Sequence, residues 1–561
     1  MKKLYLIIAT VLCFSSCDLD KLPETDLPDN KFWKTENDLR AACNTMYNQL
    51  AGFYYASNGS NNSRTWHDNR SDELVGTSAN GTSAGNRTVP STSVHEWTDP
   101  YTRIFAANDI ILKASRARVE EGVLNRYLAE AYFFRAYYYF MLVKFYGDVP
   151  LSLKAIQDPN DPDMYIGRTP REQVIQQCYK DLEFAAQWLP TRVAISDADW
   201  GRVMRSSALG MIVRIGLYEG TFSKYHALGG DYKTHLKKSI DAAELLMKEG
   251  HDLYPDFQKL FYFDGEGKQN KESVFVKIYG PNGNGTTVHA RSRTMENGVS
   301  ITRQMIDLFL YRDGLPREKS PLKIASETSF DDAFKDRDPR LKMTAFCLED
   351  KDAFKGAYTP FVNQHGNGYS IKKGFMLSEW TTVSKETVDN MIIRYAEILI
   401  SYAEALYEYN GSITDDQLEK TVNKLRSRVG LTVKLTNDFV TANSLNMLDE
   451  IRRERTVEFI DEGFRYDDIM RWKIAEKVLP VAMIGAKYVE GETSKARKDL
   501  ANRLTDANGK LNGVQVSDQA DMYVIELANT RKFDVKKDYL YPVPLNEISM
   551  SRENIIQNPN W

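Results

Sequence analysis

The chain has 561 residues, of which 42% are hydrophobic and 27% are charged, and its formal net charge at pH 7 is −4. This composition is typical of a large globular protein and argues against an intrinsically disordered one. The slight negative charge gives no indication that nucleic acid or an anionic bilayer surface is a partner.

The first seventeen residues have the three regions of a secretory signal. Lys2 and Lys3 precede an apolar run from Leu4 to Leu12, and two serines precede Cys17. The segment "LCFSSC" is similar to a relaxed bacterial lipobox, so we predict a signal peptide over residues 1–16, acylation of Cys17 and a lipidated tether over 17–30. The alternative is simple cleavage near Cys17, which would leave a soluble periplasmic protein.

A polar stretch follows the first predicted helix, which spans Asn37 to Phe53. From Ser57 to Ser93 the chain is rich in Ser, Asn, Gly and Thr. A long polar loop that contains a tryptophan is uncommon in a compact domain unless the loop binds something. We therefore predict that this stretch contains ligand-binding residues, and the candidates are Trp66, Asp68, Asn69 and Arg70.

The segment from Leu124 to Tyr146 predicts a core helix. Its apolar residues form two adjacent stripes at helical spacing, so the helix is apolar on nearly all sides. Arg135 and Lys144 interrupt the run before it reaches the length of a membrane span. Gly147 and Pro150 follow as a typical helix stop.

Helical patterns occur in pairs joined by short turns. Each pair has the form of a tetratricopeptide repeat unit, so we predict a mainly α fold with four helical pairs, in a scaffold over about 124–250 and 391–480. The predicted pairs are Leu124–Tyr146 with Arg171–Leu189, Val203–Tyr225 with Tyr232–Glu249, Ile392–Tyr409 with Asp415–Val429, and Met447–Ile460 with Tyr466–Val478.

Between the second and third pairs, residues 254–390 have few helix signals and many loop signals. Only Ser273–Tyr279 alternates like a strand, so we predict an irregular subdomain with few short strands. We expect its aromatic residues to be exposed and to contribute to binding, although each residue alone fits packing equally well. These residues are Tyr279, Tyr358, Tyr369 and Trp380, and the predicted variable loops span about 57–95 and 279–380.

Motifs for catalysis or metal binding are absent from the sequence. There is no HExxH, no GxSxG and no histidine pair at metal-ligand spacing. The cysteines that follow Cys17, which are Cys43, Cys178 and Cys347, are too widely spaced for a zinc site. The densest charge cluster, Asp449–Trp472, contains five arginines and predicts a structural ion-pair network. A glycosidase-like carboxylate pair within the cluster is the alternative. We predict no cofactor and no metal site.

Five segments resemble the SusD/RagB family of outer-membrane nutrient-binding lipoproteins. They are "AEAYFFRAYYYFMLVKFYGDVPL" at Ala129, "RYAEILISYAEAL" at Arg394, "VNKLRSRVGL" at Val422, "IRRERTVEFIDEGFRYDDIMRW" at Ile451 and "YLYPVPLNEISMSRENIIQNPNW" ending at Trp561. With the lipobox, these segments span the chain. The departures are Phe14 in the lipobox and Asp461 with Phe464 in the fourth segment.

The resemblance implies a SusD-like domain over residues 31–561 whose loops capture glycan at the cell surface. It also implies a non-catalytic protein, lipid-anchored to the outer membrane, that delivers its ligand to a TonB-dependent transporter of the SusC type. Trp66 would stack on a sugar ring while Asp68, Asn69 and Arg70 bond its hydroxyls. The alternative within the family is an oligopeptide-binding, RagB-like importer subunit.

Overall fold

The computed structural model describes residues 32–47, 50, 52, 63–76, 78–279, 299–351, 353, 356–358, 368–381, 387–488 and 503–561. The predicted signal peptide, Cys17 and the tether lie outside these ranges. Within these ranges, no helix combines the length and the apolar composition needed to cross a bilayer.

The described part of the chain is mainly helical with a few short strands, which confirms the predicted fold class. Its α-helices are α2 (Glu36–Tyr47), α3 (Arg64–Asp68), α4 (His95–Lys113), α5 (Glu121–Tyr146), α6 (Arg171–Trp188), α7 (Arg205–His226), α8 (Tyr232–Leu246), α10 (Arg303–Leu308), α11 (Arg340–Thr344), α12 (Leu377–Trp380), α13 (Tyr395–Asn410), α14 (Asp415–Lys420), α15 (Val422–Arg428), α16 (Asn437–Ala442), α17 (Met447–Glu458), α18 (Arg465–Arg471), α19 (Ala475–Val478) and α21 (Leu545–Met550).

Helix α5 is the core helix that the sequence predicts. It packs between α4 and α6, and Gly147 ends it with a φ of +74°, a conformation that favours glycine. Arg135, which interrupts its apolar face, is buried and forms a two-pronged ion pair with Asp181 of α6 at 2.7 Å. The charge of Arg135 is therefore not exposed to solvent, and its ion pair with Asp181 joins α5 to α6.

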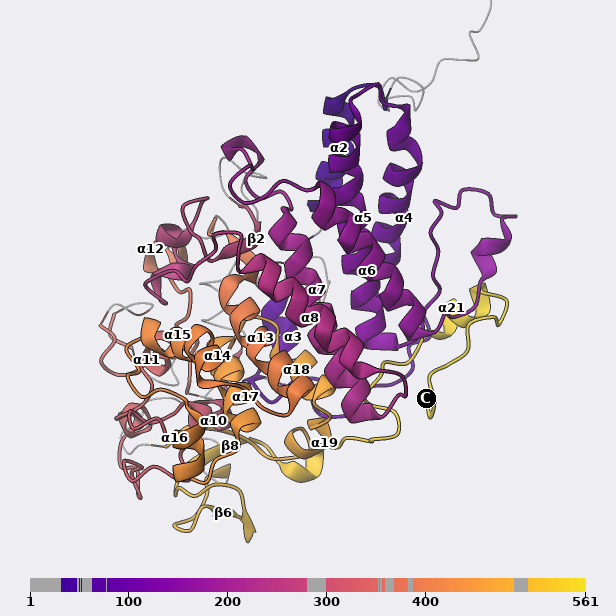
Figure 1. Ribbon diagram of the computed structural model, residues 1–561. Helices are drawn as coiled ribbons and strands as arrows, with labels where there is room; N and C mark the ends of the chain where they lie inside the picture. The colour runs from indigo at the N-terminus through magenta and orange to yellow at the C-terminus, as the bar shows by residue number, and fades with distance from the viewer. Residues whose placement is uncertain are drawn as a thin grey trace, which may run out of the picture.

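The two predicted N-terminal pairs, α5 with α6 and α7 with α8, pack side by side, with α7 and α8 in the middle of Figure 1 and α5 and α6 to their right. Gly216 lets α7 approach α8 closely, because a Cβ atom there would lie 2.6 Å from the carbonyl oxygen of His235. Helix α13 then packs on α7 and α8, α17 packs on α13, and α18 packs on α7. The C-terminal pairs are thus joined to the N-terminal ones despite the long segment between them.

Two predicted helices are divided in the structure, and one of them is Tyr466–Val478, which forms α18 and α19. The pattern over Asp415–Val429 forms α14 and α15, because Thr421 between them adopts φ −125° and ψ −94°. The hydroxyl of Thr421 donates a hydrogen bond to the carbonyl of Gln417 at 2.6 Å. A local side-chain bond of this kind competes with the regular helical ladder.

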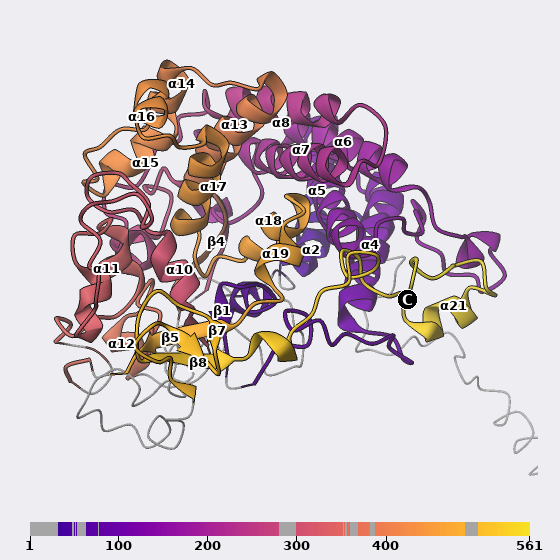
Figure 2. The ribbon, with the colours of Figure 1, turned by 90° about the horizontal axis from the view of Figure 1, so that it is seen from below.

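The strands form two-stranded antiparallel pairs among the described residues: β1 (Leu74–Val75) with β3 (Ser300–Ile301), β2 (Ser273–Lys277) with β4 (Asn390–Arg394), β5 (Met483–Lys487) with β8 (Met522–Glu526), and β6 (Lys510–Leu511) with β7 (Val514–Gln515). Strand β2 confirms the one strand predicted from alternation. Figure 2 shows β5 and β8 on the side of the molecule opposite the α7–α8 pair.

Ten buried charges connect the helical scaffold to the loop-rich subdomain. We call them the central ion-pair network, and each of these side chains is 3% exposed or less. The cations are Arg340, Lys373, Arg394, Arg426 and Arg428, and the anions are Glu272, Asp338, Glu454, Glu458 and Glu462. The charge cluster at Asp449–Trp472 is therefore structural, as predicted.

Arg394 pairs with three carboxylates of the network. Its guanidinium bonds Glu462 with two hydrogen bonds of 2.7 Å, Glu458 at 2.7 Å and Glu272 at 2.9 Å. Burial opposes the ionisation of Glu462, but Arg394 and Lys373 outweigh it and lower the pKa of this carboxyl to about 2. The carboxyl group of Glu462 is therefore held as an anion.

Replacing Arg394 with Ala should lower the free energy of unfolding by about 3–5 kcal/mol, because it leaves two carboxylates buried without their main partner. Urea denaturation of the chain starting at residue 18 measures this change. The control is Lys434→Ala, which breaks an ion pair with Glu419 whose side chains are 61% and 53% exposed and should lose about 1 kcal/mol at most. Equal, small losses in both variants would contradict a stabilising network.

Candidate functional site

The candidate site is built around the short helix α3, which carries Trp66. Ser63 caps this helix by accepting a hydrogen bond from the Trp66 backbone N–H at 3.1 Å. Trp66 is partly exposed, while its neighbours Thr65 and Asp68 are buried. The sequence predicts a loop here, but the structure has a short helix that packs into the protein and leaves the indole of Trp66 partly exposed.

Asp68 attaches α3 to the turn that precedes α18. Its two carboxylate oxygens accept the backbone N–H groups of Gly463 at 2.6 Å and Arg465 at 3.1 Å, and its side chain is fully buried. Thr65 adds a hydrogen bond of 2.6 Å to Asp461 of the same turn. Asp68 thus lies in the interior and is hydrogen-bonded to the protein. The sequence hypothesis, in contrast, expects its carboxylate to bond a sugar hydroxyl.

Asn69 and Arg70 are also buried, and each has partners within the chain. The N–H of Asn69 closes the end of α3 by donating to Thr65. Arg70 forms an ion pair with Glu96 of α4 at 2.7 Å, and its guanidinium lies 5.4 Å from the ring centre of Phe145. These contacts fix α3 against α4 and α5.

Tyr279, Tyr358, Tyr369 and Trp380 are all buried, so the expectation that these loop aromatics are exposed is wrong. Tyr369 accepts a hydrogen bond from Arg303 at 3.2 Å and packs beside Phe330, and the Tyr358 hydroxyl donates to the carbonyl of Gly368 at 2.7 Å. The physical reason is that the described residues of this irregular subdomain form only short helices and short strands, which cannot supply a core by themselves. Aromatic side chains from the loops form that core instead.

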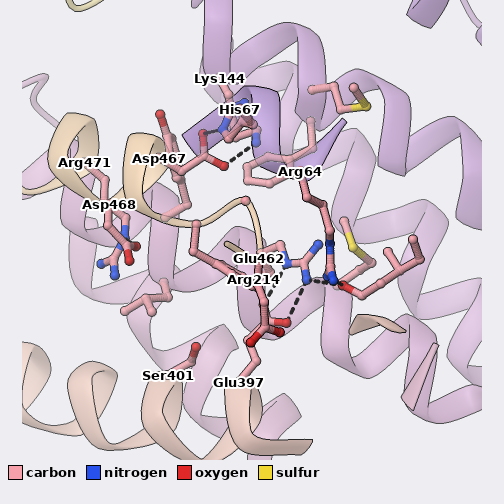
Figure 3. A pocket seen from close by; sticks show the side chains of 18 of the residues that line it. Arg64, His67, Lys144, Arg214, Glu397, Ser401, Glu462, Asp467, Asp468 and Arg471 are labelled. Atoms are coloured by element: carbon pink, nitrogen blue, oxygen red, sulfur yellow. Dashed lines mark hydrogen bonds and ion pairs between the residues drawn. The ribbon is translucent and has the colours of Figure 1, made fainter. Parts of the chain in front are cut away.

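A cavity of about 120 Å³ lies next to α3, between α5, α7, α13 and the segment that leads into α18. Figure 3 shows that charged side chains from all of these elements point toward one another around it. The side chains that matter below are Arg64, His67, Lys144, Arg214, Glu397 and Asp467. A polar cavity of this size accommodates a few water molecules rather than a sugar ring.

The charges around the cavity are paired with one another. Lys144 of α5 and His67 both contact Asp467, the latter at 3.0 Å, and Arg214 of α7 grips Glu397 of α13 with two bonds of 2.7 Å. Burial opposes the ionisation of Asp467, but Lys144 and His67 outweigh it and lower the pKa of this carboxyl well below its usual range. These contacts therefore join α5 and α3 to α18 through Asp467, and α7 to α13 through Arg214 and Glu397.

The tautomer of His67 follows from its two neighbours. A guanidinium can only donate, so Nδ1, which lies 3.3 Å from Arg70, is the acceptor and Nε2 carries the hydrogen that faces Asp467. Burial lowers the pKa of His67, and Asp467 opposes this shift in part. The sequence reasoning missed these cavity residues, although charged residues such as Lys144 and Arg214 within apolar helices were a usable signal.

Two further carboxyls lie close together at the end of the β2–β4 pair. The backbone N–H of Asp389 donates to Glu266 at 2.9 Å, and Asp389 accepts the backbone N–H of Tyr279 at 2.9 Å. Burial, followed by the charge of Glu266, raises the pKa of Asp389 to about 7. Both bonds involve backbone groups, which favours a role in holding the strand end.

Among the described residues, no group of three or more metal-ligating side chains is arranged to hold a metal ion.

The paired helices and the loop-rich subdomain define a helical-repeat scaffold that carries a loop-built face. The sequence model of the SusD family matches residues 259–561, and a second one described as "Starch-binding associating with outer membrane" matches residues 19–217. The first match covers more than half of the chain. This protein therefore belongs to the SusD family, as its sequence motifs predict.

Relatives and solved structures agree with this assignment. SusD-like protein P2 of Formosa agariphila is 26% identical over an alignment of 583 residues that covers 100% of this chain and 99% of the relative. A SusD-like carbohydrate binding protein from Bacteroides fragilis has the same fold, with a TM-score of 0.75, 23% identity, and coverage of 92% of this chain and 99% of that one. Surface glycan-binding protein A from Bacteroides thetaiotaomicron, in complex with laminarihexaose, has a TM-score of 0.62 at 19% identity, covering 94% and 100%.

Asp68 and Glu73 form a buried acid pair that makes the stability of the α3 attachment depend on pH. Glu73 accepts the backbone N–H of Asp461 at 2.7 Å and lies within hydrogen-bonding reach of Asp68. Burial, and then the neighbouring carboxylates, raise the pKa of both groups, so the folded protein keeps a proton that the unfolded chain loses near pH 4. Stability should therefore fall as the pH rises from about 4 toward the raised pKa values.

Glu73→Gln should reduce this fall, because the amide keeps the hydrogen bonds without needing a proton. The measurement is the free energy of unfolding of both proteins at several pH values between 4 and 8. The difference between the variant and the wild type should grow in favour of the variant as the pH rises. A difference that stays constant across the range would contradict a shared proton, and Glu419→Gln at the surface is the matched control.

Proposed function

We propose that this protein is a cell-surface glycan-binding lipoprotein that captures an oligo- or polysaccharide and delivers it to a SusC-like TonB-dependent outer-membrane transporter. The observation that carries the proposal is the membership of the SusD family across nearly the whole chain. It is supported by neighbours described as carbohydrate-binding and laminarin-binding SusD-like proteins. Acylation of Cys17 would hold the protein at the outer membrane.

Trp66 is the residue that we propose for stacking on a sugar ring. Its indole is partly exposed, and the helix that carries it is held by buried hydrogen bonds from Asp68 and Thr65. A rigidly held aromatic side chain loses little conformational entropy on binding. This arrangement suits the flat apolar face of a pyranose or furanose.

We propose capture without catalysis. A glycosidase requires a carboxylic acid with a raised pKa beside a carboxylate in a sugar-binding cleft. The carboxyls of Glu404 and Glu462 have pKa values of about 2 because the arginines around them outweigh the effect of burial. Burial raises the pKa of Asp389 to about 7, and it also raises the pKa values of Asp68 and Glu73. All three carboxyls accept hydrogen bonds from backbone N–H groups, which supports structural roles for them.

Trp66→Ala should weaken binding of the captured glycan by about 1–3 kcal/mol, which is the range for aromatic stacking, and leave the melting temperature nearly unchanged. The measurement is calorimetry with the chain starting at residue 18, first screened against a glycan panel that includes laminarihexaose. Trp188→Ala on α6 is the control and should leave binding unchanged.

Two other results of the glycan screen would change the proposal. Binding of oligopeptides with no binding of any glycan would replace it with the peptide-importer alternative. Release of shortened products from a bound glycan would reveal a glycosidase, for which Asp389→Asn is then the diagnostic variant.

Cys17→Ala should move the protein from the membrane fraction to the soluble fraction, because stable attachment needs the acyl chains. A tagged wild-type copy solubilised in mild detergent should bring its TonB-dependent transporter with it. Recovery of the wild type alone, in cells that contain the transporter, would contradict the partnership. An unchanged membrane fraction for the variant would contradict the lipid anchor.

A further inference from the structure

A continuous groove runs along α11 on the loop-rich side of the molecule. Two cavities of about 610 and 530 Å³ share Gln258 and Lys372 in their walls, so they form one elongated depression. Each is within the size range of small-ligand sites. The groove passes α11, the turn after α15 and the segment that leads into α12, which lie on the same side in Figures 1 and 2.

The larger half of the groove is lined by an excess of positive charge. Its basic residues are Arg312, Arg337, Lys342 and Lys372. The one acidic residue in this lining, Asp338, is fully buried and forms an ion pair with Arg340 at 2.6 Å, so it does not offset them. We call this depression the basic groove.

The cations at the rim of the basic groove are bound only weakly to the protein. Arg312 is 71% exposed and lies 3.9 Å from Asp336, which is itself 56% exposed. Lys342 contacts Glu349 at 2.6 Å, and both side chains are well exposed. Ion pairs at such exposed positions contribute little to stability, so an anionic ligand can replace the carboxylates without destabilising the fold.

One of these basic residues, Arg337, is buried and has no carboxylate in hydrogen-bonding contact among the residues that the structure describes. The guanidinium of Arg337 donates to the carbonyl oxygens of Phe309 at 2.6 Å, Ile306 at 2.7 Å and Ala333 at 3.2 Å. Burial lowers the pKa of Arg337, while Asp307 acts on it through space in the opposite direction. Because carbonyl dipoles stabilise this charge without cancelling it, the groove retains a positive potential.

The same walls also offer surface for the uncharged part of a sugar. Pro339, Met343 and Leu431 contribute apolar surface, and Gly430 has open space where a side chain would project. Apolar surface interspersed with cations fits a saccharide that carries acidic groups better than a purely ionic polymer. Lys372, paired with Asp350, lies where the two halves meet and would contact a ligand that spans both.

We propose that the basic groove binds an acidic glycan, in which uronate carboxylates or sulfate esters contact Arg312, Lys342 and Lys372. This inference rests on the proposed glycan-binding function and adds to it the chemical class of the ligand. The site is separate from Trp66, which would contact an uncharged face of the chain.

The test compares a hexamer of galacturonic acid with the same hexamer fully methyl-esterified, by calorimetry on the chain starting at residue 18. A sulfated galactan hexamer is the third probe and distinguishes sulfate from carboxylate recognition. Binding of an acidic hexamer should be about tenfold tighter than that of the neutral one, and it should weaken as salt is added. The double variant R312Q/K372Q should lose this preference, and K434Q, at an exposed lysine outside the groove, should keep it.

Each outcome separates this inference from the proposed function. Equal affinity for the acidic and esterified hexamers, or an acidic preference that survives in R312Q/K372Q, overturns the basic groove and leaves glycan binding in place. Failure of the wild type to bind any glycan overturns both. An unchanged melting temperature of R312Q/K372Q is the check that a lost preference reflects the groove and not the fold.

Discussion

The structure depends on the central ion-pair network, and above all on Arg394 between Glu458 and Glu462. Charges that are removed from water are tolerated only when each one finds a partner and the hydrogen-bonding positions are filled. Here the five cations and five anions balance. They come from β4 and the residue before β2, from α11 and the turn before it, from α15, from α17 and the turn after it, and from the segment around Lys373. The helical scaffold and the loop-rich subdomain must therefore be placed correctly together, because removing either leaves buried charges unpaired.

The position of α3 follows from the same network. Glu462, an anion of the network, lies between Asp461 and Gly463, and these two residues are in the turn to which α3 is attached. Asp461 has a φ of +61°, and a Cβ atom on Gly463 would lie 3.3 Å from Arg64. The tight turn thus brings its N–H groups to Asp68. As a result, helix α3, which carries Trp66, is attached through Thr65 and Asp68 to the same turn that contributes Glu462 to the network.

The sequence predicts the helices well and the candidate site poorly, and the reason is physical. Apolar spacing identifies α5, α7 and α13 because their packing faces are local in sequence. Asp68 and Arg70 look like surface residues of a polar loop, because their partners Gly463 and Glu96 are remote or on another element. The loop aromatics are ambiguous for a related reason, since no local pattern distinguishes a stacking platform from the core of an irregular subdomain.

The balance of charge in the interior also determines where ligand selection can occur. The carboxylates and guanidiniums of the central ion-pair network satisfy one another, so they offer no charge to a ligand. The chain as a whole carries a formal net charge of −4. Such a protein does not attract polyanions from a distance, and charges farther apart than about 8 Å are largely screened in physiological salt. A basic groove on this protein must therefore act by direct contact after encounter. Its selectivity for acidic glycans is then expressed mainly in how slowly they dissociate, because contact charges formed within the groove affect the bound state far more than the approach to it.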